Sequence, residues 1–290
     1  MAEGLPPPDG QMLSAFEFTL SQPAREIHQS QNLIGEAYVL SSGAGQVRPR
    51  DGYAMERFEV NGRTPVELRG SKRSQRTEMK ESRASAALNQ PGDMIWYGWS
   101  VFIDQATLTP DEDAFGRPAK MHLGQFHQRD AEGAALSPAL MINLTTEGDL
   151  IAQFERAVGK RAYTLVSGGR SGEAAKGQWI DILVGARWSD AGALTEIRVR
   201  RQGERHYRLV AHDEGRNTST GRIFFKYGVY RSFTERDPAL ERSRSVAYFD
   251  AVRRGAHPGQ VMLPPAAPIG SGLALDWGVA DWARGHQRRD

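Results

Sequence analysis

Short runs rich in aromatic and β-branched residues, separated by turn sequences, recur along most of this chain. Residues that favour tight turns mark the breaks, at Asn61-Gly62, Asn89-Gln-Pro-Gly92, Glu147-Gly-Asp149, Ser167-Gly-Gly169, Asp190-Ala-Gly192 and Gln202-Gly203. Between them lie runs of strand length, such as 96–103, 139–144, 179–188 and 195–200. This rhythm predicts an all-β sandwich of two antiparallel sheets.

The chain length is compatible with one large β domain. It has 290 residues, and all-β sandwiches often exceed 200 residues as a single unit. We expect a single domain over 1–255, followed by a Pro- and Gly-rich extension over 256–290. Because the first and last strands of sandwiches are often neighbours, we also expect 16–20 to pair beside 246–250.

Composition excludes several classes of protein. A hydrophobic fraction of 39% with 25% charged residues is typical of a soluble globular protein. The net charge of +2 is too small to predict nucleic-acid binding, and no apolar run has transmembrane length. There are no cysteines, so disulfides and thiolate metal sites are absent. We expect a monomer without nucleic-acid or membrane partners.

Two clusters of basic residues offer local positive charge. One contains Arg69, Lys72, Arg73 and Arg76; the other contains Arg198, Arg200, Arg201 and Arg205. Either cluster could bind a polyanion, and either could be an ordinary solvated face. The sequence does not choose between them.

The run 222–230 alternates as a strand does. One face would carry Phe224, Lys226, Gly228 and Tyr230, and the other Phe225, Tyr227 and Val229. A lysine and a phenol among apolar residues need polar partners, which a ligand would supply. The alternative is a half-buried strand whose lysine reaches water.

Two further strands carry polar residues on one face. In 75–81 these are Arg76, Glu78 and Lys80, and in 123–127 they are Gln125 and His127. Together with Lys226 and Tyr230, the strands supply a guanidinium, an amide, an imidazole, an ammonium and a phenol. This set suits recognition of a sugar carboxylate.

Three segments, Arg76-Thr77-Glu78, Gln125-Phe126-His127 and 224–230, resemble in this order the strand motifs of jelly-roll polysaccharide lyases, including alginate lyases. The stretches 96–102, 177–181, 187–189 and 248–253 are similar to the glucuronan lyase and heparin lyase I branch. The resemblance covers about 55–254. It implies a concanavalin-like β-jelly-roll and cleavage of an acidic polysaccharide.

β-Elimination from a uronate polymer requires three functions. The carboxylate must be neutralised, a base must take the C5 proton, and an acid must protonate the departing 4-oxygen. Arg76 and Gln125 suit the first function, joined by His127 if it is protonated. Tyr230 is the candidate for both proton transfers, with Lys226 as the cation that favours its phenolate.

Stereochemistry divides the possible substrates. In glucuronate or mannuronate the proton and the 4-oxygen leave from the same side, so Tyr230 alone suffices. In iduronate or guluronate they leave from opposite sides, so His127 is needed as the base. The likeness to glucuronan and heparin lyases favours glucuronate.

Other residues are expected near the substrate. Glu78 would orient Arg76 or Lys226, while Asn143, Tyr227 and Asn217 would line the sugar-binding face. We expect no cofactor; the acidic turn Asp111-Glu-Asp113 offers only weak support for a structural calcium ion, because its ligand spacing is not ordered.

Two other functions remain open. A glycoside hydrolase on a similar sandwich needs two carboxylates, and Glu235-Arg-Asp237 lacks the final glutamate of the familiar hydrolase strand. A non-catalytic carbohydrate-binding module would lack the phenol and its cation.

The start of the chain has no export signal. Because an external polysaccharide requires export, we expect a secreted or periplasmic protein whose signal has been removed.

Overall fold

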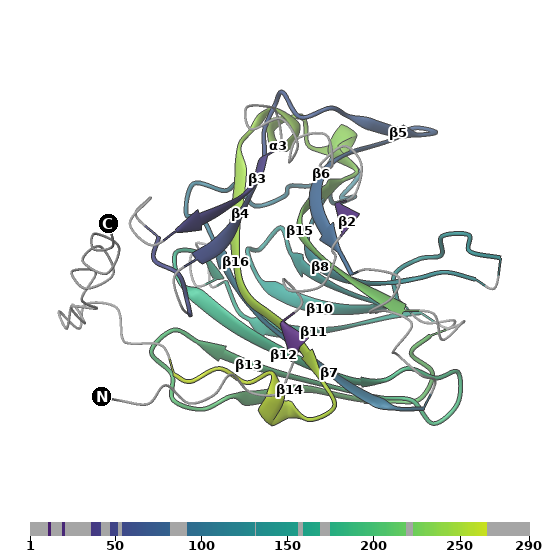
Figure 1. The fold of residues 1–290 in the computed structure, drawn as a ribbon. Helices are drawn as coiled ribbons and strands as arrows, with labels where there is room; N and C mark the ends of the chain where they lie inside the picture. The colour runs from purple at the N-terminus through teal and green to yellow at the C-terminus, as the bar shows by residue number, and fades with distance from the viewer. Residues whose placement is uncertain are drawn as a thin grey trace, which may run out of the picture.

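The computed structural model describes residues 47–51, 54–81, 92–130, 132–155, 159–168, 175–218 and 223–265, with short strands at 11–12, 19–20 and 36–41. Two antiparallel sheets of eight strands each pack face to face (Figure 1). The prediction of an all-β, jelly-roll-type sandwich is therefore confirmed. Within the described residues no helix has the length and apolar character needed to span a membrane.

The first sheet has the strand order β14-β13-β12-β7-β16-β4-β3, and β1 also pairs with β16. The strands are β1 (Gln11–Met12), β3 (Glu36–Ser41), β4 (Ala54–Val60), β7 (Met94–Ile103), β12 (Trp179–Arg187), β13 (Leu194–Arg201), β14 (Arg208–Glu214) and β16 (Ser245–Gly255).

The second sheet has the order β11-β10-β9-β8-β15-β6-β2, and β5 also pairs with β6. The strands are β2 (Thr19–Leu20), β5 (Glu67–Arg69), β6 (Lys72–Lys80), β8 (Lys120–Gln128), β9 (Leu140–Leu144), β10 (Leu150–Glu155), β11 (Lys160–Val166) and β15 (Ile223–Ser232). Three short helical segments follow β15 or β16: η3 (Thr234–Arg236), α3 (Pro238–Arg242) and η4 (Pro258–Gln260).

Alternation along the central strands builds the core between the sheets. In β15, Phe225, Tyr227 and Val229 belong to the buried hydrophobic cluster, and they share one face as the alternation predicted. From the first sheet, Tyr97 and Trp99 meet Phe225 with ring-centre distances of 5.6 and 4.8 Å. The opposite face of β15 carries Lys226 and Tyr230.

The expected pairing of 16–20 with 246–250 is wrong. Residues 246–249 pair with β4, while β2 pairs with Lys80 and Met79 of β6 in the other sheet. It is β1 that pairs with β16, at Arg253 and Arg254. Alternation indicates strands but carries no information about their partners.

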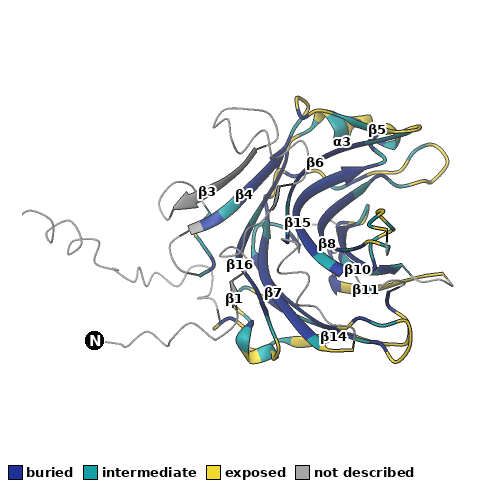
Figure 2. Ribbon diagram, turned by 45° about the vertical axis from the view of Figure 1, so that its right-hand side comes forward, coloured by how far each residue is buried: buried dark blue, intermediate teal, exposed yellow. Residues whose placement is uncertain are grey.

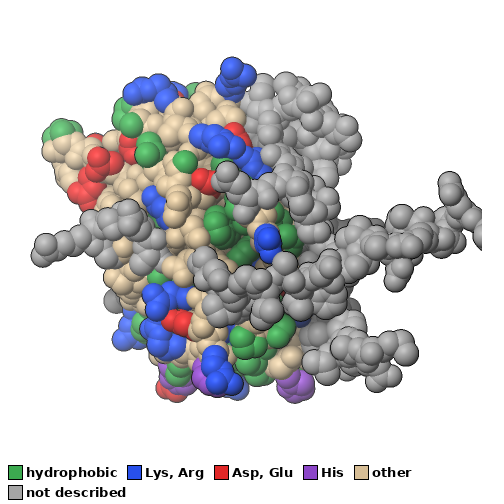
Figure 3. All heavy atoms as spheres, turned by 90° about the vertical axis from the view of Figure 1, so that its left-hand side faces the viewer, with side chains coloured by type: hydrophobic (Ala, Val, Ile, Leu, Met, Phe, Trp, Pro, Cys, Tyr) green, Lys and Arg blue, Asp and Glu red, His purple; other side chains and the backbone are tan. Residues whose placement is uncertain are grey.

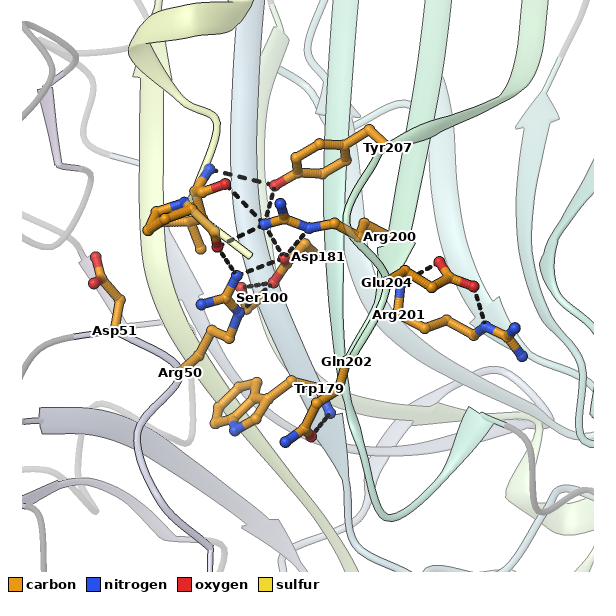
Figure 4. Close-up of polar contacts among 12 residues, drawn as sticks. Arg50, Asp51, Ser100, Trp179, Asp181, Arg200, Arg201, Gln202, Glu204 and Tyr207 are labelled. Atoms are coloured by element: carbon orange, nitrogen blue, oxygen red, sulfur yellow. Dashed lines mark hydrogen bonds and ion pairs between the residues drawn. The ribbon is translucent and has the colours of Figure 1, made fainter. Parts of the chain in front are cut away.

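A buried ionic cluster ties the chain across the outer face of the first sheet (Figure 4). Asp181 of β12 accepts hydrogen bonds from Arg50 at 2.8 and 2.9 Å, from Arg200 at 2.7 and 3.0 Å, and from Ser100 at 2.6 Å. Arg200 also donates to the carbonyls of Leu263 and Pro264. The segment after η4 thus packs on the sheet. Residues 266–290 lie outside the described residues, and the domain boundary at 255 stays a prediction.

Candidate active site

The predicted catalytic residues lie on β6, β15 and β8, which are adjacent strands of the second sheet. Their outer face points away from the first sheet, and these strands visibly curve (Figure 2). Tyr230 pairs with Arg76 on one side and with His122 on the other. Lys226 pairs with Gln125. Three segments far apart in the sequence therefore share one surface.

Glu78 contacts polar side chains from all three strands of this surface. Its carboxylate accepts a hydrogen bond from Lys226 Nζ at 2.6 Å and another from Gln125 Nε2, and it lies 3.5 Å from Arg76 Nη1. Glu78 lies opposite Gly228, which has φ of 136° and whose added Cβ would come within 2.3 Å of the Thr77 carbonyl oxygen. Only glycine fits this close approach. One carboxylate thus orients a residue from each of the three strands.

Glu78 is ionised despite its burial. Burial alone would raise its pKa, but Lys226 and Arg76 hold the pKa of this carboxyl below its ordinary value. Burial would likewise lower the pKa of Arg76, and the negative charges of Glu78 and other neighbours raise it. Glu78 and Arg76 therefore keep each other charged at neutral pH.

The Tyr230 ring lies between two neighbouring strands. The Arg76 guanidinium carbon is 4.1 Å from its ring centre, and the His122 ring centre is 4.9 Å away, tilted by 34°. Within the described residues the Tyr230 phenol forms no hydrogen bond, while the residue is 9% exposed. The sequence named Lys226 as the cation beside Tyr230, but Lys226 is bound to Glu78, and Arg76 takes that place.

His122 is a site residue that the sequence analysis missed. Its Nδ1 lies 2.6 Å from Asn143 Oδ1, and its Nε2 lies 2.9 Å from Ser232 Oγ. Because Asn143 Nδ2 donates to Gln153 Oε1 at 3.3 Å, its Oδ1 faces His122 and accepts from Nδ1–H. Burial lowers the pKa of His122 to about 4. The ring is therefore neutral, with both nitrogens hydrogen-bonded.

An irregularity in β8 hid His122 from the sequence analysis. Strict alternation from Gln125 would place Leu123 on the polar face and His122 in the core. The register with β9 shifts between His122 and Gly124, and Leu123 is 1% exposed within the core cluster. The only available signal was a histidine two residues from a glycine in a strand.

His127 is partly exposed and its ring stacks on Phe224, with ring centres 5.2 Å apart. Its Nδ1 lies 2.9 Å from the carbonyl oxygen of Gln128, which can only accept. Nε2 therefore holds a lone pair. Burial, together with the charge of Lys226, lowers the pKa of His127 to about 4, so the protonated form in which it would join Arg76 and Gln125 is not favoured.

The three other expected substrate contacts lie in different places. Asn143 is on the same face, bonded to His122. The prediction that Tyr227 lines the sugar-binding face is wrong, because Tyr227 is fully buried between the sheets and its hydroxyl donates to Glu56 at 2.6 Å. The prediction for Asn217 is also wrong, because Asn217 is buried and donates to Arg187 O at the end of β12 and to Thr195 Oγ1 near the start of β13, in the first sheet.

Two acidic residues named in the sequence analysis, Asp113 and Asp237, have local roles. Asp113 is paired with Arg117 at 2.7 Å and accepts from backbone amides of its own turn. Asp237 caps α3 by accepting from Leu240 N. Among the described residues, no group of three or more acidic or histidine side chains is arranged to hold a metal ion.

Several solved structures are similar to this chain. Alginate lyase A1-II', a member of polysaccharide lyase family 7, has 15% identity and a TM-score of 0.45, over 69% of this chain and 79% of that one. Alginate lyase AlgAT5 of the same family has 13% identity and 0.42, over 74% and 83%. The catalytic domain of a family GH131 β-glucanase from Podospora anserina has 10% identity and 0.42, over 73% and 74%. No curated protein matches the chain.

The family comparison covers most of the described residues. The family model described as "Polysaccharide lyase" matches residues 43–253, which include β6, β8 and β15 with the whole candidate site. It does not distinguish the glucuronan and heparin lyase branch, which stays a prediction. The chain belongs to the polysaccharide lyase family.

Proposed function

We propose that this polysaccharide lyase cleaves a uronate-containing acidic polysaccharide, with Tyr230 as the proton-transfer residue. The observation that carries the proposal is the position of the Tyr230 phenol beside Arg76, on the face where Glu78 gathers Gln125 and Lys226. The phenol has no hydrogen-bond partner among the described residues, so it is available to a substrate.

Arg76 and Gln125 are the donors that we assign to the sugar carboxylate. Both contact Glu78, so they lie no farther apart than that carboxylate can bridge, and Arg76 also packs on Tyr230. A guanidinium has five N–H donors and an amide has two, so each keeps donors for a substrate. Their charge and dipole would stabilise the enolate-like intermediate that follows loss of the C5 proton.

Tyr230 would act at both stages. The phenolate takes the C5 proton, and the resulting phenol returns a proton to the departing 4-oxygen. The C4–O bond breaks as the C4–C5 double bond forms, and Tyr230 ends with the proton count it started with. A single residue can perform both transfers only when the two groups leave from the same side.

The positions of His127 and His122 support this assignment. His127 pairs with Phe224, and its place along the strands is five to six residues from Tyr230, roughly 16 to 20 Å in extended chain. His122 is adjacent to Tyr230, but both of its nitrogens are engaged. Neither imidazole is well placed as a base opposite Tyr230. We therefore favour glucuronate-type polymers over polymers of iduronate or guluronate. We also propose that the protein acts outside the cytoplasm.

The test is the absorbance of the 4,5-unsaturated product near ~235 nm. Wild-type protein is mixed with glucuronan, heparin, heparan sulfate, hyaluronan, alginate and pectate. The expected result is the fastest rise on glucuronan and a loss of activity of roughly 100- to 10,000-fold in Tyr230→Phe. Tyr227→Phe, which removes a phenol from the core side of the same strand, is the matched control and should keep its activity.

Two results would redirect the proposal. Fastest cleavage of polyguluronate or heparin would contradict the single-residue mechanism and require a separate base opposite Tyr230. Binding of a polymer without any rise in absorbance would favour a non-catalytic carbohydrate-binding protein.

A further inference from the structure

A second group of cations lies beyond Tyr230, where β15 ends. It surrounds the ring of Phe233. Lys72 Nζ is 4.4 Å from the ring centre, the guanidinium carbon of Arg236 is 4.0 Å away, and Lys120 Nζ is 5.8 Å away. The three cations come from β6, η3 and β8, so the fold assembles them around one aromatic ring.

These cations have little compensation from the protein. Among the described residues, no carboxylate lies within ion-pair distance of Lys72 or Lys120. The nearby Glu155 pairs instead with Lys160 at 3.5 Å, and Arg236 is 3.8 Å from the exposed Glu235 and donates to the Pro118 carbonyl. Burial, together with the charge of Lys160, lowers the pKa of Lys120, and Arg236 and Lys72 act in the same direction. Like charges that are held together in this way favour an anion between them.

The backbone at Phe233 is a second, independent observation. Phe233 has φ of 60° and ψ of 39°, in the left-handed region that a residue with a side chain rarely adopts. This conformation costs free energy, and such strain is concentrated at functional sites. It places a partly exposed aromatic ring at the centre of the cations, where a glycine would have relieved the strain but offered no ring.

One of the cations connects this group to the candidate active site. Lys72 Nζ lies 5.8 Å from the Tyr230 ring centre as well as 4.4 Å from that of Phe233. A polymer whose uronate lies at Tyr230 and which continues along β15 would therefore bring its next sugar to Phe233. The ring offers an apolar surface to the sugar, and the cations offer donors to its acidic group.

We propose that Lys72, Lys120, Arg236 and Phe233 form an anion-binding subsite for the sugar next to the one at Tyr230, which takes a carboxylate or a sulfate. The proposal rests on the proposed function for the direction of the polymer. It makes the enzyme selective for polymers with acidic groups on successive sugars. Hyaluronan, in which every second sugar is neutral, would not fill the subsite.

The experiment measures binding separately from cleavage. Tyr230→Phe protein is titrated calorimetrically with glucuronan oligosaccharides, which carry carboxylates, and with heparin oligosaccharides, which carry sulfates. Adding Lys72→Gln and Lys120→Gln should weaken binding at least about tenfold for the probe that the subsite accepts. In the protein that retains Tyr230, the same pair should raise KM by a similar factor and leave kcat within about threefold.

The matched control is the pair Arg187→Gln and Arg242→Gln, which removes the same charge from exposed positions elsewhere. It should change affinity less than twofold. Equal weakening by both pairs, or none by the lysine pair, would overturn the subsite. If wild type cleaves no polymer but the lysine pair still weakens binding selectively, the proposed function fails and the subsite stands. Thermal unfolding confirms that each variant is folded.

Discussion

The outer faces of the two sheets each carry buried or half-buried cations, and some of these cations are treated in opposite ways. On the first sheet, Arg50 and Arg200 share Asp181, and backbone carbonyls take their remaining donors (Figure 4). In the view toward β3 and β4, basic and acidic side chains also lie side by side at several places (Figure 3). On the second sheet, Lys72 and Lys120 face the aromatic ring of Phe233. Among the described residues, no carboxylate lies within ion-pair distance of either lysine.

The difference separates a structural role from a binding role. Buried charges that contribute to folding are matched by partners, because an unmatched one costs several kcal/mol. Cations left unmatched at a partly exposed position cost less and remain available to a ligand. The sequence contained two similar basic clusters, and both hold paired arginines. In 198–205, Arg198 and Arg201 pair with Glu196 and Glu204, and Arg200 with Asp181. In 69–76, Arg73 pairs with Glu241 and Arg76 with Glu67 and Glu78, so the difference lies in Lys72, which faces the ring of Phe233.

The largest expected effect is on the first sheet. Asp181→Asn leaves Arg50 and Arg200 buried without a counter-charge, so the free energy of unfolding should fall by about 3–5 kcal/mol. Denaturant titration measures this change. The control is Glu204→Gln, which breaks a more exposed pair with Arg201 and should cost under about 1 kcal/mol. Equal effects of the two substitutions would remove the distinction between the faces.

His122 sharpens the comparison, because the second sheet buries this residue uncharged. Its pKa is lowered to about 4 by burial, whereas the unfolded chain titrates near 6.5. The unfolded state therefore binds more protons between these values, and the stabilisation is complete above pH 6.5 and lost as the pH falls to 4. The loss should approach about 3 kcal/mol. Glu56 and Asp250, whose pKa values are raised by burial, act in the opposite sense.

The measurement for His122 is the difference in unfolding free energy between wild type and His122→Gln, at several pH values. Comparing the two proteins cancels the contributions of the other groups. The difference should stay constant above pH 7 and shrink toward pH 4. A difference independent of pH would mean that His122 titrates normally in the folded protein.

Substitutions at Phe233 test whether its backbone conformation lowers the stability of the protein. Phe233→Gly and Phe233→Ala both remove the ring, but only glycine relieves the left-handed backbone conformation. The glycine variant should therefore be more stable than the alanine variant by about 1 kcal/mol, and both should bind polymer weakly. If the alanine variant were equally stable, the backbone would be unstrained and this support for the subsite would disappear.

The smallest expected effect distinguishes the faces most clearly. Lys72→Gln with Lys120→Gln removes cations that repel each other, so the free energy of unfolding should change by less than about 0.5 kcal/mol and should not fall. Thermal or denaturant unfolding measures it beside Asp181→Asn. A loss of several kcal/mol would show that these lysines have structural partners.

The sequence predicted the strands and the faces of β6 and β15 well, because period-2 alternation is a local property. Arg76, Glu78, Lys226 and Tyr230 do share one face. It did not predict which cation lies beside Tyr230, since this depends on the register between strands and on the Glu78 carboxylate opposite Gly228. The sequence analysis missed His122 because of one irregularity in β8. It assigned Asn217 to the site without any positional signal.

The central claim is that Tyr230 transfers the protons, and the most direct measurement is the initial rate of unsaturated-uronate formation by Tyr230→Phe on the polymer that wild type cleaves fastest. The substitution keeps the ring between Arg76 and His122 and removes only the hydroxyl. The account predicts a loss in kcat of roughly 100- to 10,000-fold with little change in KM. A variant that retains a tenth or more of the wild-type rate would contradict it.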